Sequence, residues 1–171
     1  MNYLQASILA VLLTLCCWVD AQAQLPEGTV SIGLGVGYLP QERFPKEVVS
    51  LGLGGGYFLA DNLEIGLGLS RATNENKDQA YGLSSSFTGY IPLAETLYLP
   101  LSVGVGKTLI SKPKSDSETA YAFGAGLLLQ IEELIGINLG VSFGTAGGFR
   151  AKAFASYGIG AQVFLRPKTI K

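Results

Sequence analysis

The chain has 171 residues, of which 48% are hydrophobic and 23 are glycine, with 12 basic and 13 acidic residues. This composition is too apolar for a disordered chain and too irregular for collagen, and the length suits one domain. A net charge near zero gives no footprint for nucleic-acid binding, so we expect no nucleic-acid partner. After residue 24 no stretch reaches 18 apolar residues, which excludes a transmembrane helix there.

The first 23 residues have the pattern of a secretory signal peptide. Residues 8–19 form an apolar core, and Ala21, Gln22 and Ala23 fit the small-x-small motif of a cleavage site. We therefore expect export, cleavage after Ala23, and a mature domain over residues 24–171. Both cysteines, Cys16 and Cys17, lie in the leader, so the mature chain has no thiol for a disulfide or a sulfur metal site.

The mature sequence alternates bulky apolar residues with small or polar ones. Residues 30–38 are the clearest case, because Val, Ile, Leu, Val and Tyr alternate there with Ser and Gly. A strand places successive side chains on opposite faces, so this pattern predicts a strand with one apolar and one nearly bare face. The same criterion predicts eight strands, at residues 28–38, 48–59, 63–70, 80–91, 97–108, 119–131, 135–144 and 152–165.

The connections between these strands alternate in length. The joins at 60–62, 92–96 and 132–134 are short, whereas the other four are longer and rich in Pro, Gly or charge. An even number of strands with tight turns at one end and longer loops at the other is the plan of an antiparallel up-and-down transmembrane β-barrel. We expect short periplasmic turns, longer extracellular loops and both termini at the short-turn end.

The two strand faces decide which solvent surrounds the barrel. A soluble barrel or sandwich buries its large side chains and covers its outside with charge, but the second face here consists mainly of Gly and Ser. We therefore expect the large residues to face lipid and the small ones to line the lumen. Aromatic residues at the ends of the bulky face predict two interfacial girdles, formed by Tyr38, Tyr81, Tyr121 and Phe143 at the long-loop end and by Tyr57 at the short-turn end.

With these features the chain resembles the small eight-stranded bacterial outer-membrane β-barrel family, of the OmpA-transmembrane-domain and OmpX type. The resemblance covers the leader and essentially all of residues 28–165. It implies location in the outer membrane and, through the strand end at 160–165, recognition by the barrel assembly machinery. Residues 166–171 depart from the family, many of whose members end at the terminal aromatic residue. We also expect a monomer.

The sequence offers no site for catalysis or for a cofactor. It contains no histidine, which excludes a Ser-His or Cys-His nucleophile and removes the commonest zinc ligand. The enzymes of the family that the chain resembles, such as lipid A deacylases, outer-membrane phospholipases and omptin proteases, depend on histidine. The glycine patterns at 33–37 and 52–56 precede no predicted helix, so they do not predict a nucleotide site. We therefore expect the protein to have no enzymatic activity, no cofactor and no bound metal ion.

Large inward residues gather at the short-turn end and predict a plug at the base of the lumen, formed by Phe58, Glu64, Tyr90, Tyr98 and Phe164 together with Leu128 and Gln130. Glu64 is the one carboxylate whose parity places it inside. A buried carboxylate needs a partner, and Tyr90, Tyr98 and Arg166 are the candidates. The group is either a structural plug or a gate or binding contact.

Charge differs between the two ends. Nine basic residues fall in the predicted long loops, at positions 43, 46, 71, 77, 107, 112, 114, 150 and 152, against six acidic ones at 42, 47, 75, 78, 116 and 118. A basic rim of this kind, in particular Lys112, Lys114 and Lys152, is suited to the phosphates of lipopolysaccharide, although it is also compatible with ordinary solvated loops. Outer-membrane lipids and lipopolysaccharide are therefore the expected partners.

Three functions remain open from the sequence. The first is a non-enzymatic outer-membrane barrel with a structural, adhesive or surface-interaction role carried by its extracellular loops, of which residues 107–119 form the longest. The second is a small pore or a carrier of a small molecule in the upper lumen. The third is a secreted soluble barrel that binds an apolar ligand in the manner of lipocalins.

Overall fold

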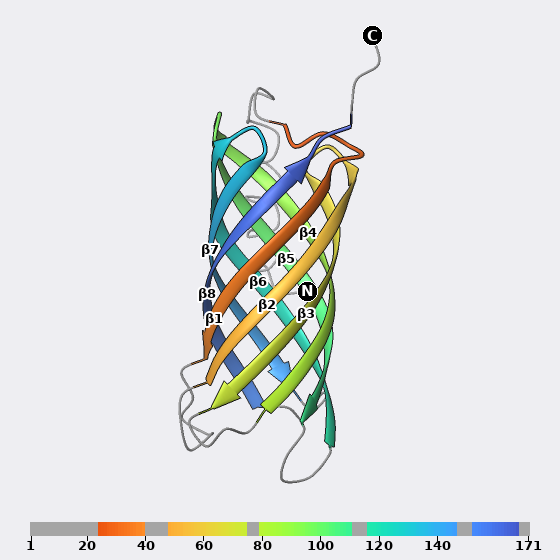
Figure 1. Cartoon of the computed structure of the whole chain (residues 1–171), viewed down its shortest axis with the longest axis vertical. Helices are drawn as coiled ribbons and strands as arrows, with labels where there is room; N and C mark the ends of the chain where they lie inside the picture. The colour runs from red at the N-terminus through yellow and green to blue at the C-terminus, as the bar shows by residue number, and fades with distance from the viewer. Residues whose placement is uncertain (1–23, 40–47, 75–78, 111–115, 147–151, 168–171) are drawn as a thin grey trace, which may run out of the picture.

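Eight antiparallel strands form one closed barrel in the computed structural model, which describes residues 24–39, 48–74, 79–110, 116–146 and 152–167 (Figure 1). The strands are β1 (Val30–Leu39), β2 (Val48–Ala60), β3 (Leu63–Asn74), β4 (Gln79–Ala94), β5 (Leu97–Ile110), β6 (Asp116–Glu132), β7 (Ile135–Ala146) and β8 (Lys152–Leu165). Each strand pairs with its sequence neighbours, and β1 pairs with β8 from Val30 opposite Leu165 to Tyr38 opposite Tyr157. The predicted eight-stranded antiparallel up-and-down barrel is confirmed.

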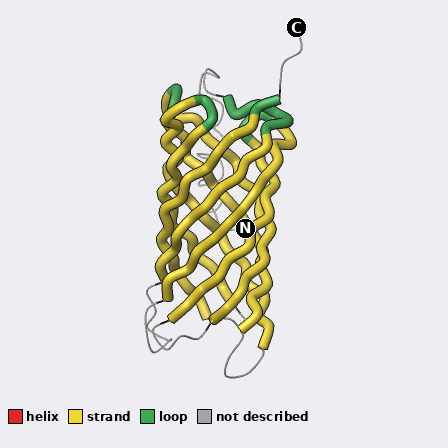
Figure 2. Tube along the Cα trace, in the orientation of Figure 1, coloured by secondary structure: helices red, strands yellow, loops and turns green. Residues whose placement is uncertain are grey.

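Closure gives every strand a hydrogen-bonded neighbour on both sides. In hydrocarbon an unpaired N–H or C=O group costs several kcal/mol, so a sheet that crosses a membrane cannot keep an open edge. Figure 2 shows strands along the whole wall of the barrel and loops only at its ends. In the residues described by the structure, no helix is long and apolar enough to cross a membrane.

Three two-residue turns lie together at the end drawn uppermost in Figure 1. They are Asp61-Asn62, Glu95-Thr96 and Glu133-Leu134, and each follows a strand whose register shifts just before the turn. Asn62 has a φ of 61°, in the left-handed region that Asn tolerates better than most residues. The predicted short joins therefore lie at one end of the barrel, as expected.

Several strands extend further than their alternation predicted. β3 continues to Asn74 instead of residue 70 because it stays paired with β2 there, and β6 begins at Asp116 instead of 119 because it is already paired with β5 there. The predicted corner at 92–96 is also too long, since β4 continues to Ala94 across an irregularity at Pro92, which lacks the N–H for a regular ladder. In the other direction, β1 starts at Val30 instead of residue 28, after Gly28 with a φ of 80°.

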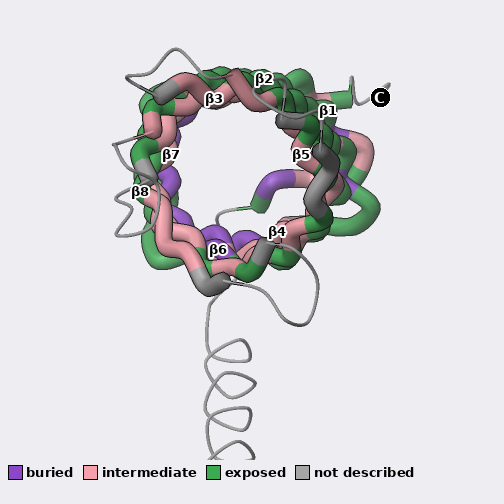
Figure 3. Tube along the Cα trace, turned by 90° about the horizontal axis from the view of Figure 1, so that it is seen from below, coloured by how far each residue is buried: buried purple, intermediate pink, exposed green. Residues whose placement is uncertain are grey.

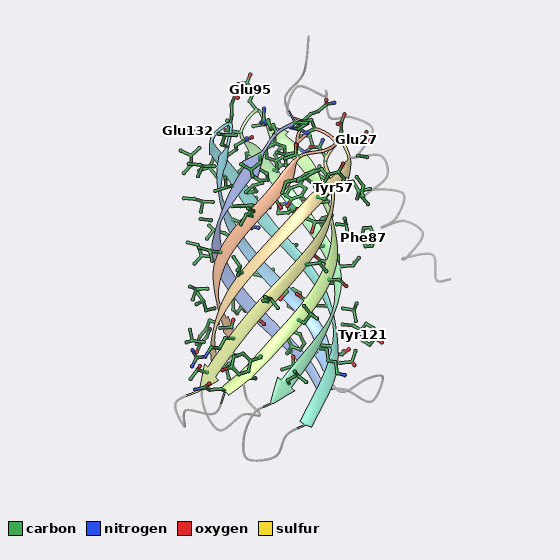
Figure 4. All side chains as sticks on the ribbon, turned by 45° about the vertical axis from the view of Figure 1, so that its right-hand side comes forward. Glu27, Tyr57, Phe87, Glu95, Tyr121 and Glu132 are labelled. Carbon is green, nitrogen blue, oxygen red and sulfur yellow. The ribbon has the colours of Figure 1, made fainter. Side chains whose placement is uncertain are left out.

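The large apolar residues lie on the outside of the barrel. Leu67 is 66% exposed, Leu83 58% and Leu139 52%, whereas only six hydrophobic residues of the described chain are buried. Figure 4 shows side chains that project outward from the strands, among them the labelled Phe87 and Tyr121. Apolar surface of this extent is stable only against lipid, so the arrangement is the reverse of a soluble ligand-binding barrel, which keeps its large residues inside.

Candidate functional site

The interior of the barrel divides into a filled base and a wider upper part. At the short-turn end, six buried hydrophobic side chains fill the bore, and each comes from a different segment of the chain: Leu25 before β1, Phe58 on β2, Tyr90 on β4, Tyr98 on β5, Leu128 on β6 and Phe164 on β8. We call this group the base plug. Figure 3 looks along the axis and shows the ring of strands that surrounds it.

Aromatic side chains of the base plug pack against one another across the bore. The ring of Phe58 stacks on Tyr90 with centroids 5.4 Å apart, and it meets Phe164 edge-on at 6.3 Å. Phe58 and Phe164 have no exposed surface. Since these three rings come from β2, β4 and β8, which are not paired with one another, their packing joins parts of the barrel wall that backbone pairing does not join.

Glu64 lies beside the aromatic rings as the only acidic side chain that the structure buries among the described residues. Its carboxylate accepts hydrogen bonds from the hydroxyl groups of Ser31 and Tyr90. Both donors reach it from other strands, so the buried charge has polar partners although no basic side chain contacts it in the described part of the chain. Of the partners expected from the sequence, Tyr90 does bond to Glu64. Ser31 was not predicted as a partner, because its short side chain is typical of residues that only line the lumen.

Gly56 makes room for that carboxylate. An ideal Cβ built at this position would fall on the carboxylate group of Glu64, which lies next to the β2 backbone. Even alanine at position 56 would therefore displace the only buried acid. This glycine is thus required by a close approach, in addition to whatever it contributes to the curvature of the strand.

A second polar group lies beside the aromatic rings. Tyr98 donates a hydrogen bond to the Oε1 atom of Gln130 over 3.4 Å, and the Nε2 atom of Gln130 donates to the backbone oxygen of Glu133 over 2.8 Å. These bonds link β5, β6 and the β6–β7 turn at the base. Tyr98 and Arg166 were the other expected partners of Glu64, and neither bonds to it in the described part of the chain. The Nε atom of Arg166 has no hydrogen-bond partner there.

The N-terminal segment closes the same end. The N–H of Leu25 donates to the Oδ1 atom of Asn62 over 2.9 Å, and the N–H of Asn62 donates to the oxygen of Leu25 over 2.8 Å. The N–H of Glu27 donates to the Oδ1 atom of Asp61 over 2.9 Å. These bonds hold residues 25–27 against the β2–β3 turn, and Leu25 is fully buried. This segment has no periodic pattern in the sequence, because it lies outside the strands.

Above the base plug the lumen is lined by glycine, serine and other small residues. A cavity of about 470 Å³ lies between β1, β8, β7 and β6, and others of about 340 and 270 Å³ lie along β2–β4 and β4–β6. Their walls include Gly35, Gly52, Ser70, Ser102 and Ser142. We call this space the vestibule. Its size is in the range of pockets that hold small molecules, and most of the polar side chains in its wall carry hydroxyl groups.

Some lumen glycines are required by strand packing. An added Cβ at Gly126 would lie 2.5 Å from the backbone oxygen of Leu139, and one at Gly160 would lie 2.8 Å from that of Leu34. Within the residues that the structure describes, no three His, Cys, Asp or Glu side chains form a group that could hold a metal ion.

The remaining predicted site residues lie outside the lumen. Tyr38, Tyr57, Tyr81, Tyr121 and Phe143 are all exposed on the outer face, and Figure 4 shows Tyr57 and Tyr121 toward opposite ends of the barrel. Of the basic residues expected in the loops, Lys112 and Lys114 lie outside the described residues, and Lys152 begins β8 with a side chain that is not described.

No protein-family profile and no curated protein matches the sequence. Solved structures do match, however. The outer membrane protein OprG of Pseudomonas aeruginosa has a TM-score of 0.60 at 12% identity, over 86% of this chain and 100% of OprG. This chain has the transmembrane β-barrel fold. Neisserial surface protein A matches with a TM-score of 0.58 at 11% identity, over 79% of this chain and 95% of that protein.

A protein designed de novo as a transmembrane β-barrel also matches, with a TM-score of 0.58 at 15% identity, over 83% of this chain and 99% of the design. The resemblance to small eight-stranded membrane barrels is therefore confirmed at the level of the fold. Because a designed chain with no evolutionary partner shares this fold, the fold alone assigns no partner or activity.

Proposed function

We propose that this chain is a non-enzymatic outer-membrane barrel whose function is carried at its long-loop end, through structural, adhesive or other surface interactions. The observation that carries the proposal is the combination of an apolar outer wall with a base plug that fills one end of the bore. A barrel that is closed on the periplasmic side and set in lipid presents only its other end to the surroundings. Neisserial surface protein A, whose name places it at a cell surface, shares the fold.

The proposal includes export through the leader at residues 1–23 with cleavage after Ala23. It also includes assembly of a monomer by the barrel assembly machinery through the strand end at 160–165. Support comes from the sequence pattern of the leader and from the position of residues 160–165 at the end of β8. The absence of histidine supports a role other than hydrolysis.

Localisation is tested by envelope fractionation of cells that express the full chain. We expect detergent-dependent extraction with the outer membrane, heat-modifiable gel migration, and labelling of a cysteine introduced within residues 111–115 in intact cells. A cysteine introduced in place of Thr96, at the opposite end, is the matched control and should remain unlabelled until the cells are opened. Extraction without detergent, or equal labelling of both cysteines, would contradict the proposal.

The role of the loops is tested by deletion. Removing residues 111–115, between β5 and β6, should reduce binding of whole cells to other surfaces, while removing residues 147–151, between β7 and β8, is the control for loss of a loop of the same length. Both variants should keep the heat-modifiable migration of the intact barrel. If the first deletion leaves every surface-binding phenotype unchanged, the loop 107–119 is not the interaction site. Lys112, Lys114 and Lys152 remain proposed contacts for lipopolysaccharide phosphates.

A second candidate function is favoured by the vestibule. A cavity of about 470 Å³ lined by glycine, hydroxyl groups and the Asn138 and Gln162 side chains is suited to hold a small polar molecule above the base plug. Single-channel recording in planar bilayers separates the possibilities. A closed scaffold gives no stable conductance, whereas a pore conducts and Glu64→Gln changes its conductance. A carrier gives saturable binding of a small polar molecule without conductance.

A further inference from the structure

Two basic side chains lie on the outer wall of the barrel, where lipid is expected. Arg71 and Lys107 were both counted with the charges of the long loops, although Lys107 also falls in the predicted strand 97–108. The structure places them within β3 and β5, near the long-loop end, and both are exposed. Among the side chains that the structure describes, they are the only charged ones on the outward face between the two ends of the barrel. All other outward positions there are uncharged, and most are apolar.

The two cations are close because both of their strands pair with β4. Arg71 is opposite Tyr81, and Lys107 is opposite Leu83, the next outward residue along β4. Neighbouring strands are about 4.8 Å apart, and the two positions are offset by two residues along the strands, so their backbones are about 12 Å apart. Long side chains that start from this separation can reach a common group above β4. We call Arg71, Tyr81, Lys107 and Tyr121 the outer basic site.

The tyrosines mark the depth of this site. Tyr81 lies on β4, between the strands that carry the two cations. Tyr121 lies on β6, opposite Val105 of β5, and so flanks Lys107 on the other side. Tyrosine is enriched at the level of the lipid headgroups, and charged residues on the outer wall of a barrel cost far less there than at the bilayer midplane. The hydroxyl group of Tyr81 already donates to the Oε1 atom of Gln79 over 3.0 Å, so the donors available to a ligand are those of Arg71 and Lys107.

The charge of the site selects its ligand. No described carboxylate lies on the outward face beside the two cations, so within the described part of the chain no acidic side chain competes with an anion from outside the protein. At headgroup depth the available anion is a lipid phosphate. The guanidinium group binds phosphate oxygens through two parallel hydrogen bonds, and the lysine ammonium group adds a second charge.

We propose that Arg71 and Lys107 form a lateral binding site for a phosphate group of a lipid in the leaflet at the long-loop end. Because this inference rests on the proposed outer-membrane location, the lipid is the phosphorylated glycolipid of the outer leaflet. The site lies on the strand wall, and it is therefore distinct from any contact that Lys112 and Lys114 make within the loop.

The experiment measures binding of lipid A to the purified mature barrel in detergent, by native mass spectrometry at several lipid concentrations. Since a cation near an anionic lipid surface strengthens binding about fivefold, Arg71→Gln or Lys107→Gln alone should weaken binding about fivefold and the double variant about thirtyfold. The double variant Lys112→Gln/Lys114→Gln removes the same charge from the loop, and it should bind within about twofold of the parent.

Three further measurements make the result specific. Chemically dephosphorylated lipid A should bind the parent and the Arg71→Gln/Lys107→Gln variant equally well. The exchange Arg71→Lys/Lys107→Arg keeps both charges and should retain most of the binding, and all variants should keep heat-modifiable migration. Unchanged binding in the wall variant, an equal loss in the loop variant, or the same loss with dephosphorylated lipid would each overturn the site. Envelope fractionation tests the proposed location separately, because binding in detergent does not depend on it.

Discussion

The base plug makes a quantitative prediction about stability. Phe58 has no exposed surface and contacts the rings of Tyr90 and Phe164, whereas Phe87 lies on the outer wall and is 49% exposed (Figure 4). In a bilayer both phenylalanines are removed from water on folding. Replacing either by alanine therefore loses the transfer of the ring out of water, which is about 1.5–3 kcal/mol for a fully buried side chain.

The two positions differ in what fills the space of the lost ring. Lipid chains move into the space left by Phe87→Ala, so its cost is the transfer contribution alone. Phe58→Ala leaves a cavity between protein groups and removes two ring contacts, and core substitutions of this kind cost about 3–5 kcal/mol. We therefore expect Phe58→Ala to lower the free energy of unfolding by about 2 kcal/mol more than Phe87→Ala.

The assay is reversible unfolding of the mature barrel in phospholipid vesicles by guanidinium chloride, followed by circular dichroism and by gel migration. Circular dichroism is used because the single tryptophan, Trp18, lies in the segment that we propose as the leader, so a barrel produced without that segment has no tryptophan fluorescence to follow. The slope of the transition should be the same for both variants, which shows that the compactness of the folded and unfolded states is unchanged. An equal loss for both variants would refute the reasoning that the base is packed to the density of a protein core.

Three other changes test the polar part of the base. Gly56→Ala should destabilise the barrel by about 1–3 kcal/mol because the new methyl group displaces the Glu64 carboxylate, and Glu64→Ala in the same chain should recover part of that loss in a double-mutant cycle of unfolding free energies. Tyr90→Phe removes a hydrogen bond to that buried carboxylate and should cost about 1.5–3 kcal/mol, with a larger cost than Tyr81→Phe, whose hydroxyl is on the surface. Asn62→Gly keeps the left-handed turn but loses the hydrogen bond from the Leu25 N–H. Hydrogen exchange of the Leu25 amide should therefore accelerate, while the strand amides remain protected. Protection of Leu25 equal to that of the parent would show that this bond does not fix the N-terminal segment.

Much of this fold was predictable because the alternation of a strand is a local property. Whether Leu67 and Gly68 point to opposite sides follows from their adjacency in an extended chain, whatever else the molecule does. The scarcity of charge on both faces then selects lipid as the surrounding medium, since water would favour many charged side chains on one of them. Strand number and the positions of the short turns follow from the same pattern.

The ends of the strands were less predictable, because pairing in a closed barrel continues where alternation stops. Arg71 does not continue an apolar pattern, yet it is paired with Leu51 on one side and Tyr81 on the other. Charged residues near strand ends looked like loop residues for this reason. Assigning Arg71 and Lys107 to loops hid the outer basic site.

Local sequence patterns were sufficient to predict that the chain forms eight strands, that its apolar face points outward, and that large inward residues concentrate at one end. These properties depend on residues a few positions apart. Only the tertiary structure decided that Ser31 and Tyr90 both reach Glu64, that Leu25 enters the base, and that Arg71 and Lys107 share one patch. Each of these contacts joins segments whose relative position depends on the register of strands around the closed barrel, and no local pattern specifies it.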